Sequence, residues 1–292
     1  MTYYYQFENV IVPWYYLAAI DQYERNIQAV RKDIPKRDTV VAIQFSDEFW
    51  SGPFNPTGQD TSPSTISYFG GFGLDGNNDG IANPQDDADI LFSISRYLSK
   101  FGTSNDDFKL ALWQYYYEEK TVNQILTIAK IYEKFNTVAL DKRSFPVPVH
   151  SNYSYKSTWG ANRGWGGRRS HQGTDVFANY GTPILSTSYG VVEIKGWNEF
   201  GGWRIGIRDI NNTYHYYAHL GSYNNDIAVG DIVEPGTIVG YVGSSGYGKE
   251  GTSGKFPPHL HYGMYKYDGR NEWAFDPYPS LQIWERKAKS NK

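Results

Sequence analysis

The chain contains no cysteine, and only 6 of its 292 residues are histidines. Without cysteine no disulfide framework can form, and any bound metal ion must be held by histidine and carboxylate side chains. No run of about 18 apolar residues occurs, so the sequence predicts no membrane-spanning helix. The net charge of −3 argues against nucleic acid as a partner, because nucleic-acid-binding proteins need a basic surface to neutralise phosphates.

What is present is typical of a folded protein of one or two domains, with 40% hydrophobic and 20% charged residues. Aromatic residues reach 17%, including 26 tyrosines and 9 tryptophans. Their flat apolar faces and polar tips suit grooves that bind sugars or peptides, although most of them are expected to fill cores. The opening "MTYYYQFENV" is not a signal peptide, so either the protein is cytosolic or the chain begins after a removed leader.

The first half, residues 1–139, has a helical pattern. In "IVPWYYLAAIDQYERNIQAVRKD" a proline near the start is followed by apolar residues at helical spacing. "DADILFSISRYLSKFG" begins with acidic residues and ends with Lys100 and Gly102, an order that complements the helix dipole. "DDFKLALWQYYYEEKTVNQILTIAKIYEKF" predicts one or two further helices.

The pattern changes in the second half. The stretch "FPVPVHSNYSYKSTWGANRGWGG" is rich in proline, glycine, serine and asparagine, and we predict a linker over residues 140–155. Residues 156–292 contain short runs with β propensity, separated by turns such as Asn211-Asn212 and Pro235-Gly236. We therefore predict a multidomain α plus β protein, with a mainly helical N-terminal domain and a C-terminal antiparallel β-sheet domain.

All six histidines lie at or after residue 150. His150 stands alone in the predicted linker and is interpreted as structural. The other five form three groups, namely His171 with Asp175, His215 with His219, and His259 with His261. Catalytic zinc typically has three protein ligands and an open position for water. One histidine, the aspartate and one further histidine meet that count.

The pair in "PPHLHYG" is the most informative, because residues i and i+2 of a strand share one face of the sheet. Two adjacent imidazoles can share a cation or divide the roles of metal ligand and base. The alternative is a pair of solvated histidines at a sheet edge.

Together with these groups, the segments "RRSHQGTDVFANYGTPIL", "YYAHL", "VGDIVEPGTIVGYVGSSG" and "PPHLHYG" resemble the LytM/lysostaphin-type zinc endopeptidases, peptidase family M23. The resemblance covers about residues 156–266. It implies an antiparallel sheet with a substrate groove and cleavage of peptide bonds in bacterial cell-wall peptidoglycan. By motif it implies zinc ligands at His171, Asp175 and His261. It also implies catalytic roles for His219 and His259.

Amide hydrolysis needs an activated water and stabilisation of the oxyanion. We assign the water-orienting or proton-handling role to His259 and the oxyanion role to His219. His215 has no counterpart in the family motif. It lies four residues from His219, so it could face the groove as well, and we expect a supporting or structural role for it.

The segments "STWGANRGWGGRRSHQGTDVFA" and "GWNEFGGWRI" look most like the sporulation-type L-Ala–D-Glu endopeptidases of bacilli. Cleavage of glycyl-glycine or D-alanyl cross-bridges remains an alternative. The resemblance implies an extracellular or cell-wall location, with any leader absent from this chain. A non-catalytic wall-binding or scaffold module is a further alternative, but the presence of all five site residues favours an enzyme.

The N-terminal segments "WYYLAAIDQYERNI" and "PSTISYFGGFGLDGNNDGIANPQDDADILFSISRYLSKFG" resemble lytic transglycosylases of the lysozyme-like superfamily. This resemblance places Glu24 at the position of the family's catalytic acid. The altered "SDEFWSGPFNPTGQDTS" and the presence of Arg25 favour a degenerate domain that binds glycan or positions the peptidase. Two alternatives for Glu24 stay open, a catalytic acid in a bifunctional enzyme and a surface carboxylate on a helix.

The stretch "DGNNDGIANPQD" fits a calcium loop of the EF-hand type, with glycine at the sixth position, where the loop turns sharply. Its twelfth position carries the shorter aspartate in place of the usual glutamate. The alternative is an acidic turn without calcium. The candidate calcium ligands are Asp75, Asn77, Asp79, the carbonyl of Ile81, and Asp86.

Overall fold

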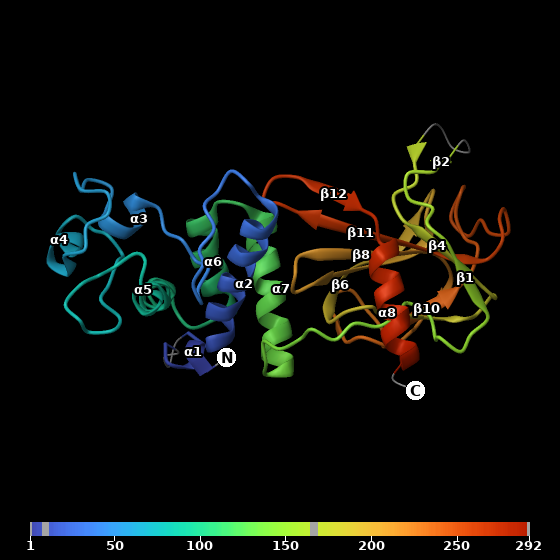
Figure 1. The fold of residues 1–292 in the computed structure, drawn as a ribbon, viewed down its shortest axis with the longest axis horizontal. Helices are drawn as coiled ribbons and strands as arrows, with labels where there is room; N and C mark the ends of the chain where they lie inside the picture. The colour runs from blue at the N-terminus through green and yellow to red at the C-terminus, as the bar shows by residue number, and fades with distance from the viewer. Residues whose placement is uncertain (1, 8–11, 164–168, 291–292) are drawn as a thin grey trace. The chain divides into compact units, whose positions relative to one another are not determined.

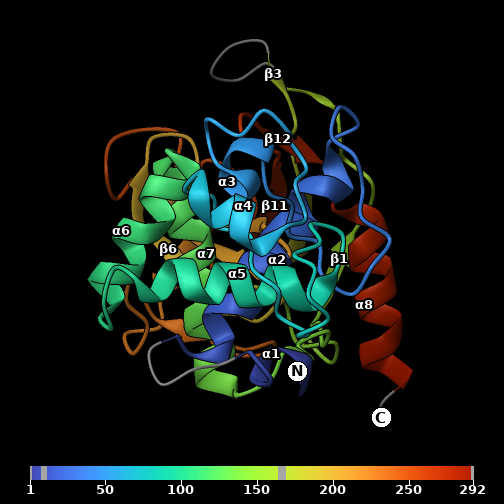
Figure 2. The same ribbon diagram turned by 90° about the vertical axis from the view of Figure 1, so that its left-hand side faces the viewer.

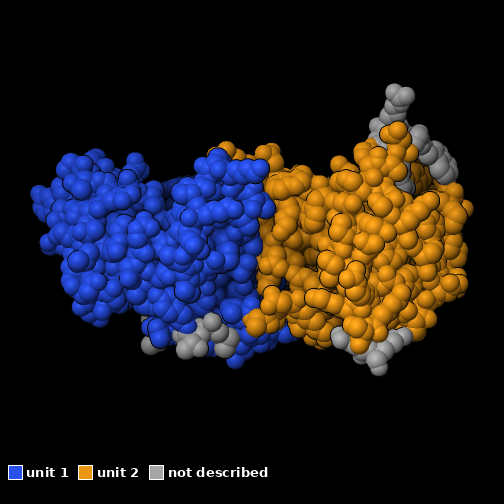
Figure 3. Space-filling model, in the orientation of Figure 1, with its two compact units in different colours: residues 1–138 blue, residues 139–292 orange. Residues whose placement is uncertain are grey.

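The computed structural model describes residues 2–7, 12–163 and 169–290. The chain divides into two compact units, residues 1–138 and residues 139–292 (Figure 3). Each unit is described by itself.

The described part of unit 1 consists of helices joined by loops and contains no strand. Helix α5 runs crosswise to α2 and α7 (Figures 1 and 2). The helices are α1 (Thr2–Tyr5), α2 (Trp14–Val30), α3 (Asp47–Ser51), α4 (Pro63–Tyr68), α5 (Asp87–Ser99), α6 (Asn105–Tyr116) and α7 (Glu119–Phe135).

The ends of these helices follow from local sequence. Helix α2 begins directly after Pro13, whose restricted φ suits a helix start. The Asp86 carboxylate caps α5 by accepting the N–H groups of Ala88 and Asp89. The stretch predicted as one or two helices forms two, α6 and α7, because Tyr117 adopts a left-handed φ of 51° between them.

Unit 2 is an antiparallel sheet domain. Its main sheet has the strand order β1-β4-β11-β8-β7-β6-β9, while β10 pairs with β5 and β8, and β12 pairs with β11. The strands are β1 (Tyr153–Tyr155), β2 (Asn162–Arg163), β3 (Arg169–Ser170), β4 (Thr174–Ala178), β5 (Pro183–Leu185), β6 (Gly190–Asn198), β7 (Gly202–Asp209), β8 (Thr213–Tyr223), β9 (Ile232–Val233), β10 (Ile238–Val242), β11 (His259–Tyr267) and β12 (Glu272–Phe275). The predicted antiparallel sheet is confirmed.

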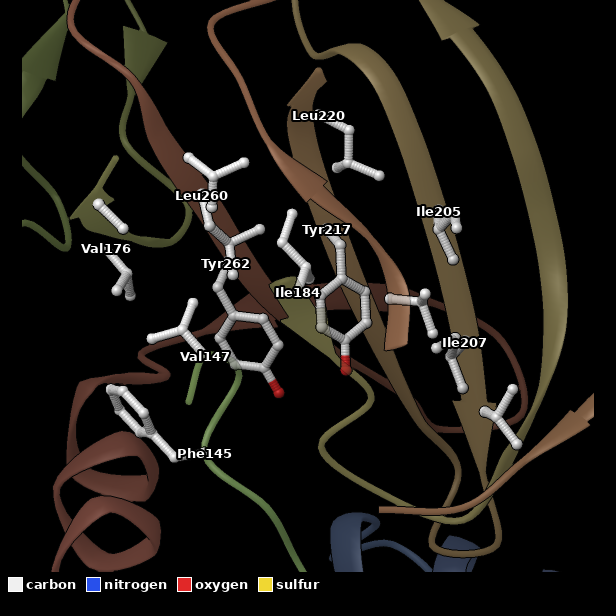
Figure 4. Close-up of a cluster of buried hydrophobic side chains, with 14 of the residues drawn as sticks. Phe145, Val147, Val176, Ile184, Ile205, Ile207, Tyr217, Leu220, Leu260 and Tyr262 are labelled. Carbon is white, nitrogen blue, oxygen red and sulfur yellow. The ribbon is translucent and has the colours of Figure 1, made fainter. Parts of the chain in front are cut away.

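The core of unit 2 lies on one face of this sheet. Leu260 and Tyr262 of β11 and Ile205 and Ile207 of β7 point into it (Figure 4). Because successive side chains of a strand point to opposite faces, His261 of β11 projects from the other face. Burial of one face therefore decides where the candidate metal ligands stand.

Residues 140–155, predicted as a linker, instead belong to the body of unit 2. Phe145 and Val147 are each 1% exposed and lie in the core (Figure 4). The carbonyl of Pro146 accepts the N–H of Leu185 at 2.8 Å. The composition of the segment correctly signals irregular backbone, but irregular backbone can still bury large apolar side chains.

Helix α8 (Tyr278–Ser290) is an element that we did not predict (Figure 1). Its buried Leu281 and Trp284 pack into the core of unit 2. Among the described residues, no helix is long and apolar enough to cross a membrane. The lysozyme-like assignment of unit 1 stays a prediction, since what the structure establishes is its helical character.

Candidate metal centre

Three of the predicted ligands converge. His171 lies just before β4, Asp175 lies on β4, and His261 lies opposite Asp175 on β11. The Nε2 atom of His171 is 2.9 Å from Nδ1 of His261 and 3.2 Å from Oδ1 of Asp175. The Nδ1 atom of His261 is 3.0 Å from the same carboxylate oxygen. Three donor atoms from three parts of the chain thus form one small triangle.

Two local features hold this triangle in place. The other ring nitrogen of His171, Nδ1, lies 2.9 Å from the carbonyl oxygen of Thr158. A carbonyl only accepts, so Nδ1 carries the proton and Nε2 is left with its lone pair. At Gly173 an added Cβ would lie 2.5 Å from Cε1 of His261. The glycine in "HQGTD" therefore makes room for the opposing imidazole.

The donor set fits a zinc ion. Zinc bonds of 2.0–2.1 Å in a tetrahedron place neighbouring ligand atoms roughly 3.3 Å apart, close to the three separations above. Burial alone would raise the pKa of Asp175, but the adjacent imidazoles of His171 and His261 hold this pKa well below its usual range. The carboxylate is therefore ionised and can bind a cation.

Two further imidazoles line the same space. The ring of His219 is 4.9 Å from that of His259 and 5.9 Å from that of His261. Nε2 of His259 lies 3.7 Å from Oδ1 of Asp175. The structure thus brings together all five site residues that the family motif implies.

His219 reaches the site because the backbone is irregular there. It has a left-handed φ of 65°, and the register between β7 and β8 shifts between Trp203 and Ile205. The N–H of His219 donates to the carbonyl of Gly201 at 2.7 Å. A bulge of this kind changes the face to which a side chain points, so His219 joins the face of His261.

Both of these imidazoles are held by backbone carbonyls. Nδ1 of His219 lies 2.8 Å from the carbonyl of Ser245, and Nδ1 of His259 lies 2.8 Å from that of Pro257. Each Nδ1 therefore carries a proton. Burial, followed by the neighbouring His259 and His261, lowers the pKa of His219 well below its usual value. A neutral His219 presents a lone pair at Nε2, so it must first take up a proton before it can donate to an oxyanion.

A pocket opens beside these residues. His219 and His261 line it together with Phe200, Tyr216, Tyr247 and Tyr265. Sequence reasoning did not identify these aromatic side chains, because nothing in their spacing distinguishes a pocket wall from a core. The ring of Tyr247 stacks against His219 at 6.0 Å.

His215 lies elsewhere. It is 1% exposed on the core face of β8, where Nε2 is 3.2 Å from Oδ2 of Asp209 and Nδ1 is 2.7 Å from the hydroxyl of Tyr262. Arg143 contacts the same Asp209 oxygen at 3.2 Å. The buried position supports the structural role that we expected. His150 is exposed in a turn and lies outside this network.

Glu24 lies in unit 1 on α2 and is half-buried. The hydroxyl of Tyr116 donates to its Oε1 at 2.7 Å. Burial raises the pKa of Glu24 to about 7, and the charge of Asp21 adds to the rise, while the Tyr116 hydrogen bond opposes it. The catalytic role of Glu24 stays a prediction.

The predicted calcium loop forms a series of tight turns. The carboxylate of Asp75 accepts the N–H groups of Asp79 and Gly80 at 3.2 and 2.8 Å. Asp86, the candidate twelfth position, caps α5, as described above. Among the described residues, the only group of three or more His, Asp or Glu side chains placed to hold a metal ion is that of His171. Calcium binding therefore stays a prediction.

Comparisons with known proteins agree with this geometry. The model of peptidase family M23 matches residues 169–277. The chain is 54% identical to the L-Ala–D-Glu endopeptidase of Bacillus subtilis (strain 168), over 98% of this chain and 88% of that protein. It is 37% identical to lysostaphin of Staphylococcus simulans, over 38% of this chain and 21% of that protein.

Among solved structures, the catalytic domain of lysostaphin from Staphylococcus simulans is 33% identical to the chain. The match covers 45% of this chain and 93% of that domain, with a TM-score of 0.37. The full-length relative from Bacillus subtilis and the matching family model carry the assignment. The chain therefore belongs to peptidase family M23, and its predicted activity as a peptidoglycan endopeptidase is confirmed.

Proposed function

We propose that this protein is a zinc-dependent endopeptidase that hydrolyses the L-Ala–D-Glu bond of bacterial cell-wall peptidoglycan. The observation that carries the bond assignment is 54% identity over 98% of the chain to an endopeptidase named for that bond. The triangle of His171, Asp175 and His261 supports the choice of metal, because two imidazoles and a carboxylate are a common donor set of catalytic zinc.

The residues of the chain divide the chemistry as follows. When bound, zinc supplies a Lewis acid that polarises the scissile carbonyl and makes water more acidic. His259 and His219 each present Nε2, with Nδ1 tied to a carbonyl. His259 orients the attacking water at Nε2, and His219 accepts the proton of that water at its own Nε2. The protonated His219 then donates a hydrogen bond to the oxyanion and passes the same proton to the leaving amine.

The place of action follows from the substrate. Peptidoglycan lies outside the cytoplasmic membrane, so we propose that the protein works in the extracellular space or the cell wall. Fractionation of cells, with detection of the protein in the wall fraction, tests this location.

The decisive experiment is digestion of purified peptidoglycan followed by mass spectrometry of the fragments. Cleavage of the L-Ala–D-Glu bond releases peptides with a free amino group on glutamate and leaves alanine carboxylates on the glycan. New glycine or D-alanine termini would reject the bond assignment. The Asp175→Ala variant, incubated in parallel, should release no new peptide termini.

Unit 1 carries a second candidate activity, cleavage of the glycan strand. One observation favours it, namely that burial raises the pKa of Glu24 to about 7 despite the hydrogen bond from Tyr116, and a general acid needs a raised pKa. Anhydro-sugar ends in the wild-type digest that disappear in Glu24→Gln would support this activity. Their absence from the wild-type digest would leave unit 1 as a glycan-binding or positioning domain.

A further inference from the structure

The two sides of the metal centre differ in chemistry along the sheet face that carries it. Strand β11 runs from His259, past His261, to Tyr265 on this face. Beside His259, on the neighbouring strand β4, lies an exposed phenylalanine, whereas near and beyond His261 lie groups that donate hydrogen bonds. An L-Ala–D-Glu bond has the same asymmetry, since alanine carries an apolar methyl group and glutamate keeps one carboxylate that the peptide chain does not use.

Phe177 forms the apolar side. Val176 of β4 points into the core, so Asp175 and Phe177 share the opposite face. Phe177 is the register partner of His259, and the two ring centroids are 5.1 Å apart. Its side chain is 38% exposed although it is large and apolar. Phe177 thus offers an uncovered ring next to an imidazole at the reaction centre.

Tyr265 and Gln172 form the polar side. Both line the pocket that His261 also lines. The Tyr265 ring leans back toward the metal centre, because its Cε2 is 3.1 Å from where a Cβ on Gly263 would lie. Gln172 is exposed, and its side-chain amide can donate hydrogen bonds.

The hydroxyl group of Tyr265 is available to donate a hydrogen bond to a substrate. Within the described part of the chain it makes no hydrogen bond. A tyrosine hydroxyl is a donor that suits a carboxylate, and a hydrogen bond to a charged acceptor is stronger than one to a neutral acceptor.

We propose that Phe177 and Tyr265 are specificity-determining residues that fix the direction of the substrate across the metal centre. The alanine methyl group packs on the ring of Phe177, and the free carboxylate of glutamate accepts hydrogen bonds from Tyr265 and Gln172. This proposal rests on the proposed L-Ala–D-Glu specificity and adds which side of the site reads which residue.

The test uses three synthetic peptides that are identical except at the scissile bond. One contains L-Ala–D-Glu, a second replaces alanine by glycine, and a third replaces the free carboxylate of glutamate by its amide. The value of kcat/KM is measured for each peptide with wild type, Phe177→Ala, Phe177→Leu and Tyr265→Phe, all loaded with zinc.

Phe177→Ala should lower the preference for alanine over glycine about tenfold, since that is the scale on which an apolar pocket reads one methyl group, and Phe177→Leu should retain most of it. Tyr265→Phe should lower the preference for the carboxylate over the amide at least tenfold. Each variant should leave the other preference unchanged. Trp273→Ala, which removes a side chain of similar exposure (40%) on β12, should change neither.

The proposal would be overturned if Phe177→Ala changed the preference for the carboxylate and Tyr265→Phe changed the preference for alanine. It would also be overturned if a variant lowered kcat/KM equally for all three peptides. Bound zinc at the wild-type ratio shows that a variant is folded. If wild type cleaves none of the three peptides, the proposed bond specificity fails and this inference falls with it. If wild type prefers L-Ala–D-Glu but the variants keep both preferences, only the inference fails.

Discussion

The two faces of strands β8 and β11 carry the same residue types but use them for different functions. On one face His219 and His261 help to form the metal centre. On the other face His215 and Tyr262 join Asp209 in a buried hydrogen-bonded network. His215 and His219 are only four residues apart, yet the bulge at His219 puts them on opposite faces. The partners around an imidazole, more than its spacing in the sequence, decide whether it can serve catalysis.

The largest expected effect is on bound zinc and activity, and it belongs to the face that carries the metal centre. Asp175→Ala and His261→Ala each remove one corner of the ligand triangle, so we expect loss of bound zinc and of peptide hydrolysis together. Metal analysis of the purified variants and an activity assay measure both quantities. Zinc retained at the wild-type ratio in either variant would refute the assignment of the triangle.

A smaller loss is expected at His219 and His259, which we propose to be catalytic and do not assign as metal ligands. His219→Ala should retain zinc and lower kcat by about 10²- to 10⁴-fold, the usual contribution of a proton-transferring side chain. Comparison of kcat with the zinc content separates this role from metal binding. Digestion of cell walls by His219→Ala at the wild-type rate would exclude the role.

A substitution on the core face should instead lower the stability of unit 2. Asp209 is 2% exposed, and it accepts hydrogen bonds from Arg143, His215 and the N–H groups of Asn211 and Thr213. Asp209→Ala leaves Arg143 without its partner, so we expect the free energy of unfolding of unit 2 to fall by about 3–5 kcal/mol. Chemical denaturation measures this change.

The same variant sharpens the contrast between the faces. Where Asp209→Ala remains folded, its zinc content and kcat should stay within about twofold of wild type, because the network lies on the core face of the sheet, opposite the candidate metal ligands. Loss of zinc by folded Asp209→Ala would show that the two faces are coupled.

The sequence predicted the metal ligands through the resemblance of its motifs to peptidase family M23, which implies His171, Asp175 and His261. Taken alone, the residues indicate that His259 and His261 share one face of a strand, whereas the spacing in "HQGTD" is a weak signal by itself. The sequence could not predict the position of His215, because a bulge depends on pairing with a distant strand. A histidine four residues before His219 could therefore face either side.

The errors in our prediction of the fold have a related cause. Residues 140–155 look like a linker by composition, but the burial of Phe145 depends on a core that only the folded sheet provides. Helix α8 was not predicted, although Leu281 and Trp284 stand three residues apart and basic residues fill its last turn. Composition reports local backbone preference, whereas burial depends on the rest of the unit.

Glu24 extends the comparison to carboxylates. The adjacent histidines keep the pKa of Asp175 low despite its burial, whereas burial raises the pKa of Glu24 from its ordinary 4.5 to about 7. A raised pKa in the folded state means that the protonated form is favoured on folding. The resulting stability is fully present below pH 4.5 and is lost as the pH rises through 7.

We therefore expect the free energy of unfolding of unit 1 to fall by about 2 kcal/mol between pH 4.5 and 7.5 through Glu24, a value discounted for its partial exposure. Denaturation of wild type and Glu24→Gln across this range measures the difference, because glutamine cannot ionise and can still accept the Tyr116 hydrogen bond. The matched control is Glu133→Gln on α7, whose exposed carboxylate accepts a hydrogen bond from Tyr15 in the same unit. Parallel pH curves for wild type and Glu24→Gln would mean that the Glu24 carboxyl group is hydrated enough to ionise normally, which would also remove the argument for an acid catalyst in unit 1.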